Sequence, residues 1–398
     1  MKPLWYRWIH WLCARIYFER IIVLHPERLP EGGPILYVGL HRNGAVDGFV
    51  YRQVLPRGIF LISTQLRRSL FARLFFCGIA VARKQDEDDR GQNDAALGQC
   101  TQLLADGGEL VVFPEGTSSL GPRHLPFKSG AASIALDALA CGVPVRIVPL
   151  GIHYERAWAF RSKVEVVVGE PISMALPAGL SELGRLKEMK RRMTTALESV
   201  GANFESAEAQ RNAERLAYVA TLGTPRSYFA SLKALEAGVP ERLLVRWREL
   251  EAQLASRRVW RHQGVPLFPV GPWVLYAWLL LVLGPMVLAG AMVNVPPLLI
   301  GWLAGRKFAD GPNVIALWRI LVGVPLFGIW MGVVTILLAL CGGGWWLLGY
   351  GLLTLAALKS LYRVRKLAVA VWNGLAQRAL ARSAHEFHQS VVQTLPPV

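Results

Sequence analysis

Two long apolar segments in the last third of the chain constrain its fold more than any other feature of the sequence. Residues 316–341 contain one charged side chain, Arg319, and residues 273–293 contain none, although Pro285 interrupts them. An α-helix of about 20 apolar residues is long enough to cross the hydrocarbon core of a bilayer. We therefore expect residues 264–362 to form helices embedded in a membrane.

The first half of the chain has the pattern of an α/β domain. Between residues 34 and 175, short apolar runs alternate with segments of helical periodicity, as in a mixed sheet flanked by helices. Strands are predicted at 35–40, 59–63, 79–82, 109–113, 145–153 and 163–169. Helices are predicted near 46–55, 68–76, 93–105 and 128–141.

The segments around this domain have helical patterns of their own. Residues 4–24 carry Trp5, Trp8 and Trp11 among basic residues, which predicts an amphipathic helix lying in the membrane interface. The alternative is an ordinary helix packed on the domain. The chain therefore divides into an interfacial helix at 1–30, an α/β domain at 31–178, a helical connector at 179–263, membrane-embedded helices at 264–362 and a C-terminal helix or tail at 363–398.

The chain carries an excess of positive charge, with 44 Lys and Arg against 28 Asp and Glu and a formal net charge of +16. A basic surface of this kind binds either nucleic acid or anionic lipid. Membrane helices would hold this surface beside lipid head groups. We therefore expect membrane lipids, including anionic phospholipid, as partners, and no nucleic acid.

The positions of the positive charges predict an orientation in the membrane. Basic residues beside short membrane loops favour the cytoplasmic side. All the basic clusters can share that side if 267–304 dips into the membrane and returns, and if 316–341 and 345–361 form a hairpin. We expect an integral protein with an even number of crossings and with the α/β domain and C-terminus in the cytoplasm. The alternative is that 267–304 lies in the interface. The clusters are Arg257-Arg258 with Arg261, Arg306-Lys307, and Arg363 with Arg365-Lys366.

His41 and Asp47 form the strongest candidate pair for chemistry. They follow the buried strand expected at 35–40. On a continuous helix their side chains would point about 240° apart, so the chain must reverse between them. Asn43-Gly44 tolerates the dihedral angles of a tight reversal. Asp47 would then lie in the first turn of a helix, where it is favoured by the helix dipole and can hold the imidazole in one tautomer.

Four blocks, in order, resemble motifs of the phospholipid/glycerol acyltransferase family, which includes glycerol-3-phosphate and lysophosphatidate acyltransferases. Two features depart from the usual family pattern. Five residues rather than four separate His41 from Asp47, and Ser118 stands where an arginine is usual. Both look like a branch that includes glycerol-3-phosphate acyltransferases, with His-x-Asn-x-x-x-Asp and Phe-Pro-Glu-Gly-x-Ser motifs. The blocks are 41–47 (HRNGAVD), 78–83 (GIAVAR), 111–119 (VVFPEGTSS) with 126–131 (PFKSGA), and 143–151 (VPVRIVPLG).

The resemblance implies a glycerolipid acyltransferase fold and a membrane-bound O-acyltransferase. Such an enzyme moves a fatty acyl group from an acyl thioester, carried by coenzyme A or acyl carrier protein, to a hydroxyl of glycerol 3-phosphate or 1-acylglycerol 3-phosphate. His41 would be the general base and Asp47 would orient it.

The resemblance also implies a set of residues that bind the acceptor. Glu115 and Gly116, with Thr117 beside them, would contact its glycerol part. Arg83 would bind its phosphate through a bidentate fork. Lys128 and Arg123 are the nearest replacements for the arginine missing at position 118. The substrate-binding set is therefore Arg83, Glu115, Gly116, Thr117, Lys128 and Arg123.

No cofactor or metal is expected, because the thioester already carries the activation for acyl transfer. The five cysteines include no Cys-x-x-Cys motif, and His385 with His388 is interpreted as a solvated helix face. Two alternatives remain. The chain could be a remodelling acyltransferase for another lysolipid or lipid-like alcohol, or a catalytically silent membrane scaffold that binds lipid.

Overall fold

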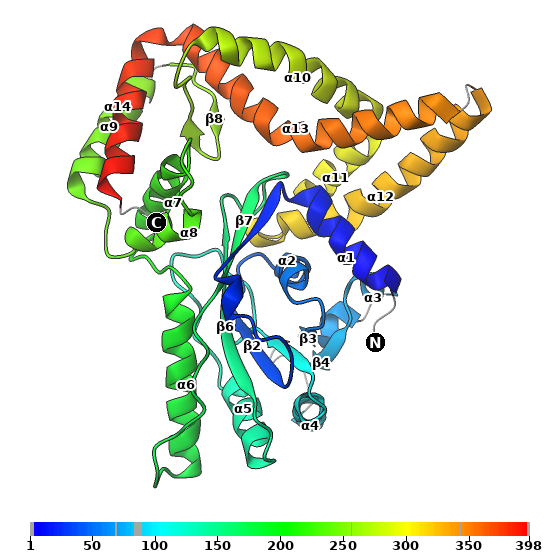
Figure 1. The fold of residues 1–398 in the computed structure, drawn as a ribbon, viewed down its shortest axis with the longest axis vertical. Coiled ribbons are helices and arrows are strands. Elements are labelled where there is room, and N and C mark those ends of the chain that lie inside the picture. The colour runs from blue at the N-terminus through cyan, green and yellow to red at the C-terminus, as the bar shows by residue number, and fades with distance from the viewer. Residues whose placement is uncertain (1–3, 68–69, 83–89, 256, 342–343, 396–398) are drawn as a thin grey trace.

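The computed structural model describes residues 4–67, 70–82, 90–255, 257–341 and 344–395. Within them, a seven-stranded mixed sheet has the strand order β1-β7-β6-β2-β5-β3-β4 (Figure 1). β6 and β7 pair antiparallel, and the other neighbours pair parallel. The strands are β1 (Arg20–Leu24), β2 (Ile35–Gly39), β3 (Ile59–Ser63), β4 (Gly78–Val81), β5 (Glu109–Val112), β6 (Arg146–Tyr154) and β7 (Lys163–Val168).

Helices flank the sheet and bury its central strands. Every residue of β2 is buried, which explains why it is a continuous apolar run rather than an alternating one. The predicted fold class, a mixed sheet flanked by helices, is confirmed, and each predicted strand and helix is present with ends that differ by a few residues. The helices of this domain are α2 (Val46–Val54), α3 (Leu70–Phe75), α4 (Arg90–Ala105) and α5 (Gly130–Ala140).

The N-terminal segment differs from its prediction. Helix α1 (Leu4–Tyr17) stops short of residue 24, and the chain continues as the edge strand β1, paired with β7. The β-branched run of residues 21–23 favours a strand. Arg161 binds the end of α1, donating to the carbonyls of Arg15 and Phe18 at 2.8 and 2.7 Å and pairing with Glu19. Helix α1 therefore ends where the sheet begins.

The connector has an apolar core of its own, which the C-terminus completes. Its helices are α6 (Glu182–Ser199), α7 (Ala207–Ala220), α8 (Tyr228–Ala234) and α9 (Glu241–Ala255), followed by the hairpin of β8 (Arg261–His262) and β9 (Val265–Pro266). Helix α14 (Arg378–Thr394) packs against α7 and α9. Arg226 fixes this contact by donating to the carbonyls of Val392 and Leu395, both at 2.8 Å. Connector and C-terminus thus form one unit.

The apolar region forms α10 (Trp273–Val293), α11 (Val295–Lys307), α12 (Pro312–Cys341) and α13 (Gly344–Ala376). Among the described residues, α10 and α12 are long and apolar enough to cross a membrane, and only 11% and 17% of their most apolar windows are buried. Helix α13 packs along α10 at one end of the molecule (Figure 1). Residues 342–343, between the two halves of the predicted hairpin, lie outside the described residues.

Helix α13 runs further than the predicted boundary at 362/363. It continues to Ala376 because it also packs on the α/β domain. Tyr362 donates to Glu155 at 2.8 Å, and Arg365 donates to the Phe160 carbonyl at 3.0 Å. The basic cluster at 363–366 therefore lies within a helix, beside the domain.

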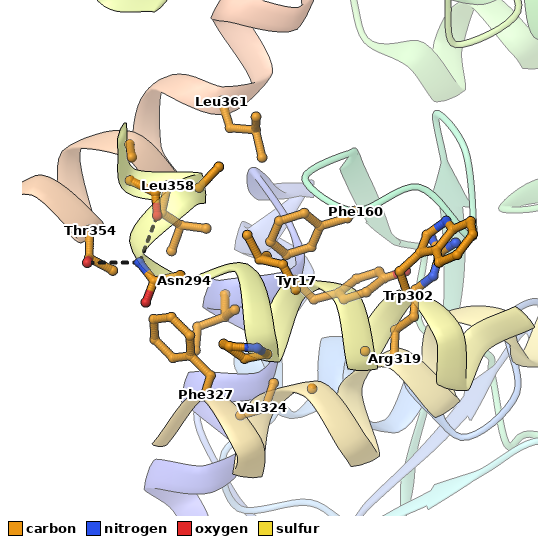
Figure 2. Close-up of a pocket in the computed structure, with 18 of the residues that line it drawn as sticks. Tyr17, Phe160, Asn294, Trp302, Arg319, Val324, Phe327, Thr354, Leu358 and Leu361 are labelled. Atoms are coloured by element: carbon orange, nitrogen blue, oxygen red, sulfur yellow. Dashed lines mark hydrogen bonds between the residues drawn. The ribbon is translucent and has the colours of Figure 1, made fainter. Parts of the chain in front are cut away.

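An apolar cavity of about 270 Å³ lies between α1 and the helices α10 to α13 (Figure 2). Asn294, at the junction of α10 and α11, lies at one side of it. Its amide nitrogen donates to the Thr354 hydroxyl at 3.1 Å, and its amide oxygen accepts from the Tyr350 hydroxyl at 2.8 Å. These bonds fix the α10–α11 junction to α13.

His153 on β6 gives the fold a point of acid sensitivity. Its Nε2 lies 2.8 Å from the Val200 carbonyl, and burial lowers the pKa of the imidazole from 6.5 to about 3. Between pH 6.5 and about pH 3, the unfolded chain therefore binds more protons than the folded chain. The free energy of unfolding falls as the pH drops through this range. We expect His153→Gln to reduce the difference between the thermal unfolding midpoints at pH 7 and pH 4.5. His385→Gln is the control. The prediction would be contradicted if His385→Gln reduced the difference between the two midpoints equally, or if His153→Gln left that difference unchanged.

Candidate functional site

The candidate site lies at the carboxyl ends of β2 and β5, which are parallel neighbours in the sheet. The loop after β2 carries His41, and the loop after β5 carries the block at 113–119. The two loops are bonded to each other. The backbone N–H of Ser119 donates to the His41 carbonyl at 3.1 Å, and the backbone N–H of His41 donates to the Glu115 carboxylate at 2.8 Å. The sheet therefore brings the two motifs together, although they are far apart in sequence.

His41 and Asp47 form a buried hydrogen-bonded pair. His41 Nδ1 lies 2.9 Å from Asp47 Oδ2, and the two residues are 8% and 0% exposed. The predicted reversal is present. Gly44 has a φ of +56°, and a Cβ atom there would lie 3.0 Å from the Asn313 carbonyl oxygen. Glycine is thus required both by the turn and by the approach of another segment.

Asp47 accepts three further hydrogen bonds. The backbone N–H groups of Arg42 and Asn43 donate to Oδ2 at 2.6 and 2.9 Å, and the Tyr154 hydroxyl donates to Oδ1 at 2.5 Å. Burial and the adjacent carboxylate raise the pKa of Tyr154 well above its ordinary value, so its hydroxyl remains a donor. These contacts hold the carboxylate in one position behind the imidazole. Tyr154 was not predicted, because nothing in its local sequence indicates a contact with Asp47.

The ring of His41 faces a cavity of about 820 Å³. It stacks on Phe113, with ring centroids 4.5 Å apart and planes inclined by 10°. Because Asp47 occupies Nδ1, the other ring nitrogen, Nε2, is the one that can react with a molecule in the cavity. A neutral imidazole placed in this way can accept a proton from a hydroxyl group.

Gly116, Thr117 and Lys128 line the same cavity. Gly116 has a φ of +71°, and a Cβ atom there would lie 2.5 Å from Lys128 Nζ. The absence of a side chain at Gly116 therefore lets the ammonium group lie over the loop. Three of the predicted substrate-binding residues are thus brought together with His41.

Arg52 is a cavity residue that was not predicted from the sequence. It is 6% exposed, and its guanidinium carbon lies 4.7 Å from the ring centroid of Phe60 and 5.4 Å from that of Tyr6. Its Nε has no hydrogen-bond partner among the described residues. With Lys128 it gives the described cavity wall two cations against one carboxylate, Asp310. The cavity is therefore suited to an anion.

Helix α12 completes the wall of this cavity. Asn313, Val314 and Leu317 line it, and Asn313 Nδ2 donates to the Ser118 hydroxyl at 2.8 Å. Ser118 stands where an arginine is usual in the family whose motifs this chain resembles. In this structure the Ser118 hydroxyl accepts the hydrogen bond from Asn313 of the apolar helix α12. The candidate site and the apolar helix α12 thus share a wall.

Glu115 joins two loops rather than lining the cavity. Its carboxylate accepts from the backbone N–H groups of His41 and Leu125 at 2.8 and 3.1 Å, and it is 2% exposed. Burial raises the pKa of this carboxyl, and the two N–H donors partly offset the effect. In this structure Glu115 positions the loop that carries His41.

Of the remaining two predicted residues, Arg123 does not join this group, and Arg83 lies outside the described residues. Arg123 is exposed, is absent from the described wall of the cavity, and donates from Nε to the Phe204 carbonyl at 3.4 Å. Among the described residues, no group of three or more His, Cys, Asp or Glu side chains could hold a metal ion.

We expect Glu115→Gln to lower the stability of the protein. The amide offers one oxygen to two backbone donors and directs an N–H toward the other, and a buried donor left unpaired costs about 1–3 kcal/mol. The measurement is the thermal unfolding midpoint of the purified protein. Glu205→Gln, at an exposed position in the connector, is the control. Equal midpoints for Glu115→Gln and the wild type would contradict the structural role.

Comparisons with known proteins agree with the resemblance in the sequence. Residues 20–153 match a protein-family model described as Acyltransferase. Over 144 residues the chain is 30% identical to a 1-acyl-sn-glycerol-3-phosphate acyltransferase of Chlamydomonas reinhardtii, covering 35% of this chain and 42% of the relative. Over 171 residues it is 29% identical to a probable 1-acyl-sn-glycerol-3-phosphate acyltransferase of Mycoplasma pneumoniae, which covers 39% of this chain and 62% of the relative. Over 67 residues it is 43% identical to glycerol-3-phosphate O-acyltransferase 2 of Saccharomyces cerevisiae, covering 16% and 9%. In each case the match spans less than two thirds of the relative.

Proposed function

We propose that this chain, whose residues 20–153 belong to the phospholipid/glycerol acyltransferase family, is a membrane-bound O-acyltransferase of glycerophospholipid synthesis. It moves a fatty acyl group from a thioester to a hydroxyl of glycerol 3-phosphate or 1-acylglycerol 3-phosphate, the acceptors in the names of its relatives. The observation that carries the proposal is the buried His41–Asp47 pair, 2.9 Å apart, at the wall of a cavity with two cations.

In the proposed mechanism, His41 is the general base. The acceptor oxygen attacks the carbonyl carbon of the thioester while its proton passes to Nε2 of His41. Asp47 holds Nδ1 and stabilises the imidazolium that forms. The tetrahedral intermediate then collapses, the carbon–sulfur bond breaks, and the thiolate takes the proton from His41 and leaves as a thiol. The products are an ester and a free thiol.

The cations of the cavity would bind the acceptor phosphate. Lys128 and Arg52 both line it, and charge-assisted hydrogen bonds to phosphate are stronger than neutral ones. Arg83 remains a proposed contributor on the basis of its motif. The donor is an acyl thioester of coenzyme A or acyl carrier protein, and the reaction as written uses no cofactor or metal.

We also propose that the protein is integral to the membrane, with its catalytic domain on the cytoplasmic face. Helices α10 and α12 have the length and hydropathy to cross, and the exposed Trp5, Trp8 and Trp11 suit an interfacial position for α1. Because α12 starts at the cavity wall, its apolar surface leads from the site toward the bilayer. A lipid acceptor or product could follow that surface.

His41→Ala should reduce acyl transfer by about 10² to 10⁴, the usual effect of losing a general base. Asp47→Asn should cause a loss of similar order, because the amide cannot hold the same imidazole tautomer. The assay is transfer of a labelled acyl group to a panel of acceptors by the purified protein, with unfolding midpoints as a check of folding. His385→Ala is the matched control. Near-wild-type turnover by His41→Ala would refute the mechanism.

Lys128→Ala should raise the KM for the phosphorylated acceptor about tenfold, while the KM for the thioester changes little. A hydrogen bond to a charged group contributes about 1.5–3 kcal/mol. Because Lys128 is exposed, we expect a loss at the lower end of this range, which corresponds to about tenfold in KM. Arg83→Ala should act in the same direction. Lys187→Ala, on the exposed face of α6, is the control. A larger change in the KM for the donor would assign Lys128 to the thioester side.

The connector and the C-terminal helix should lie on the same side of the membrane. They share an apolar core, and Arg226 bonds the end of α14. Single cysteines at Ser206 and Arg382, both exposed, should be labelled from the same side of sealed vesicles after the exposed cysteines are replaced. Labelling from opposite sides would exclude the proposed topology. The cysteines to be replaced are Cys77, Cys141 and Cys341.

A further inference from the structure

A second cavity, of about 850 Å³, adjoins the loop that carries His41 and Asp47. Arg42 and Tyr154 line it, whereas His41 faces the first cavity. Its other walls come from the end of β6, from α7 and α8 of the connector, and from the β8–β9 hairpin. Most of these elements lie outside residues 20–153, so the connector builds a site beside the catalytic pair.

The charged side chains of the described wall have an excess of cations. Five arginines face three glutamates. Each glutamate already has a partner. Glu155 accepts from Tyr362 at 2.8 Å, Glu251 pairs with Arg261 at 2.6 Å, and Glu214 accepts from Gln210 at 2.8 Å. The arginines are Arg42, Arg156, Arg211, Arg215 and Arg261.

Arg156 and Arg215 both lie beside Gly264. A Cβ atom at Gly264 would lie 3.5 Å from Arg156 Nη1 and 4.0 Å from Arg215 Nε. Each guanidinium packs over a tryptophan ring, that of Trp158 at 4.8 Å and that of Trp247 at 5.6 Å. Neither side chain has a hydrogen-bond acceptor or an ion-pair partner within the described part of the chain. Two partly buried cations thus lie beside the same glycine. Burial lowers the pKa of the Arg156 guanidinium, and the Glu214 carboxylate is near enough to offset this in part, but it forms no ion pair with either arginine.

Unpaired donors also lie at the side of the cavity near the catalytic loop. Tyr228 is 3% exposed, and its hydroxyl has no partner among the described residues. Nη1 of Arg42 is likewise buried without a partner there, although Nη2 donates to the Gly121 carbonyl at 3.0 Å. A buried donor destabilises the fold unless something accepts from it. A ligand with acceptor oxygens would satisfy both groups.

We propose that this cavity binds a phosphorylated ligand, with phosphate oxygens accepting from Arg156 and Arg215 and further oxygens accepting from Tyr228 and Arg42. Guanidinium groups match the geometry of phosphate oxygens and have no acceptor of their own. The volume exceeds what one phosphate ion needs and falls within the range of small-molecule sites. The phosphate could belong to a soluble nucleotide such as coenzyme A or to a phospholipid head group.

The site does not depend on the proposed reaction, because binding can be measured without turnover. The full-length protein in detergent is titrated in a calorimeter with inorganic pyrophosphate and with coenzyme A. In a separate arm, phosphatidylcholine vesicles with or without phosphatidic acid are tested for co-sedimentation. Saturable binding of any one probe that persists in Lys128→Ala supports the site, and the probe that binds most tightly identifies the source of the phosphate. Absence of saturable binding by all three probes overturns it.

Variants assign the binding to this cavity. Arg215→Gln and Arg156→Gln should each weaken the bound probe about tenfold, as expected for loss of a charge-assisted contact. Either variant suffices if the other fails to fold. Arg246→Gln, exposed on α9, controls for net charge, and His41→Ala should bind as the wild type does. Equal weakening by Arg246→Gln, or weakening by Lys128→Ala alone, would overturn the assignment.

Discussion

The carboxylate of Asp47 is the contact on which the rest of the site depends. It is fully buried, and it accepts hydrogen bonds from the backbone of Arg42 and Asn43, from Tyr154 and from the His41 ring. A buried carboxylate is costly unless it is fully hydrogen-bonded, so these donors must keep their positions together. The loop is thereby held in one conformation, and the imidazole faces the cavity before any ligand arrives.

The apolar helix α12 holds the same loop from another side. Asn313, at the start of α12, donates a hydrogen bond to the Ser118 hydroxyl. Its backbone carbonyl lies so close to Gly44 that a side chain there would contact it. A displacement of α12 would therefore change the contacts of the turn between His41 and Asp47. This arrangement links the apolar helices to the candidate active site by direct contact. Helix α12, which is proposed to cross the membrane, is therefore part of the wall of the candidate site.

Two cavities share this loop as a common wall. His41 and Gly44 face one, while Arg42 and Tyr154 face the other. A ligand in the second cavity would contact residues bonded directly to Asp47 or adjacent to His41 in sequence. The connector, which contributes α7 and α8 to that cavity, is therefore placed to influence the pair.

Local patterns in the amino-acid sequence were enough to predict the strands of the sheet and the candidate pair His41 and Asp47. Apolar periodicity located the strands of the sheet, and Asn43-Gly44 indicated the reversal that pairs His41 with Asp47. Such signals arise between near neighbours in the chain, so they can be read from a few residues. The apolar content of α10 and α12 likewise depends only on composition.

The contacts between residues far apart in the sequence were established by folding of the whole chain. It brought Tyr154 to Asp47 across 107 positions of sequence, placed Arg52 rather than Arg123 in the cavity wall, and turned residues 20–24 into an edge strand. It also returned α14 to the connector. These contacts are set by the packing of whole helices and strands against one another, and no local pattern encodes that packing.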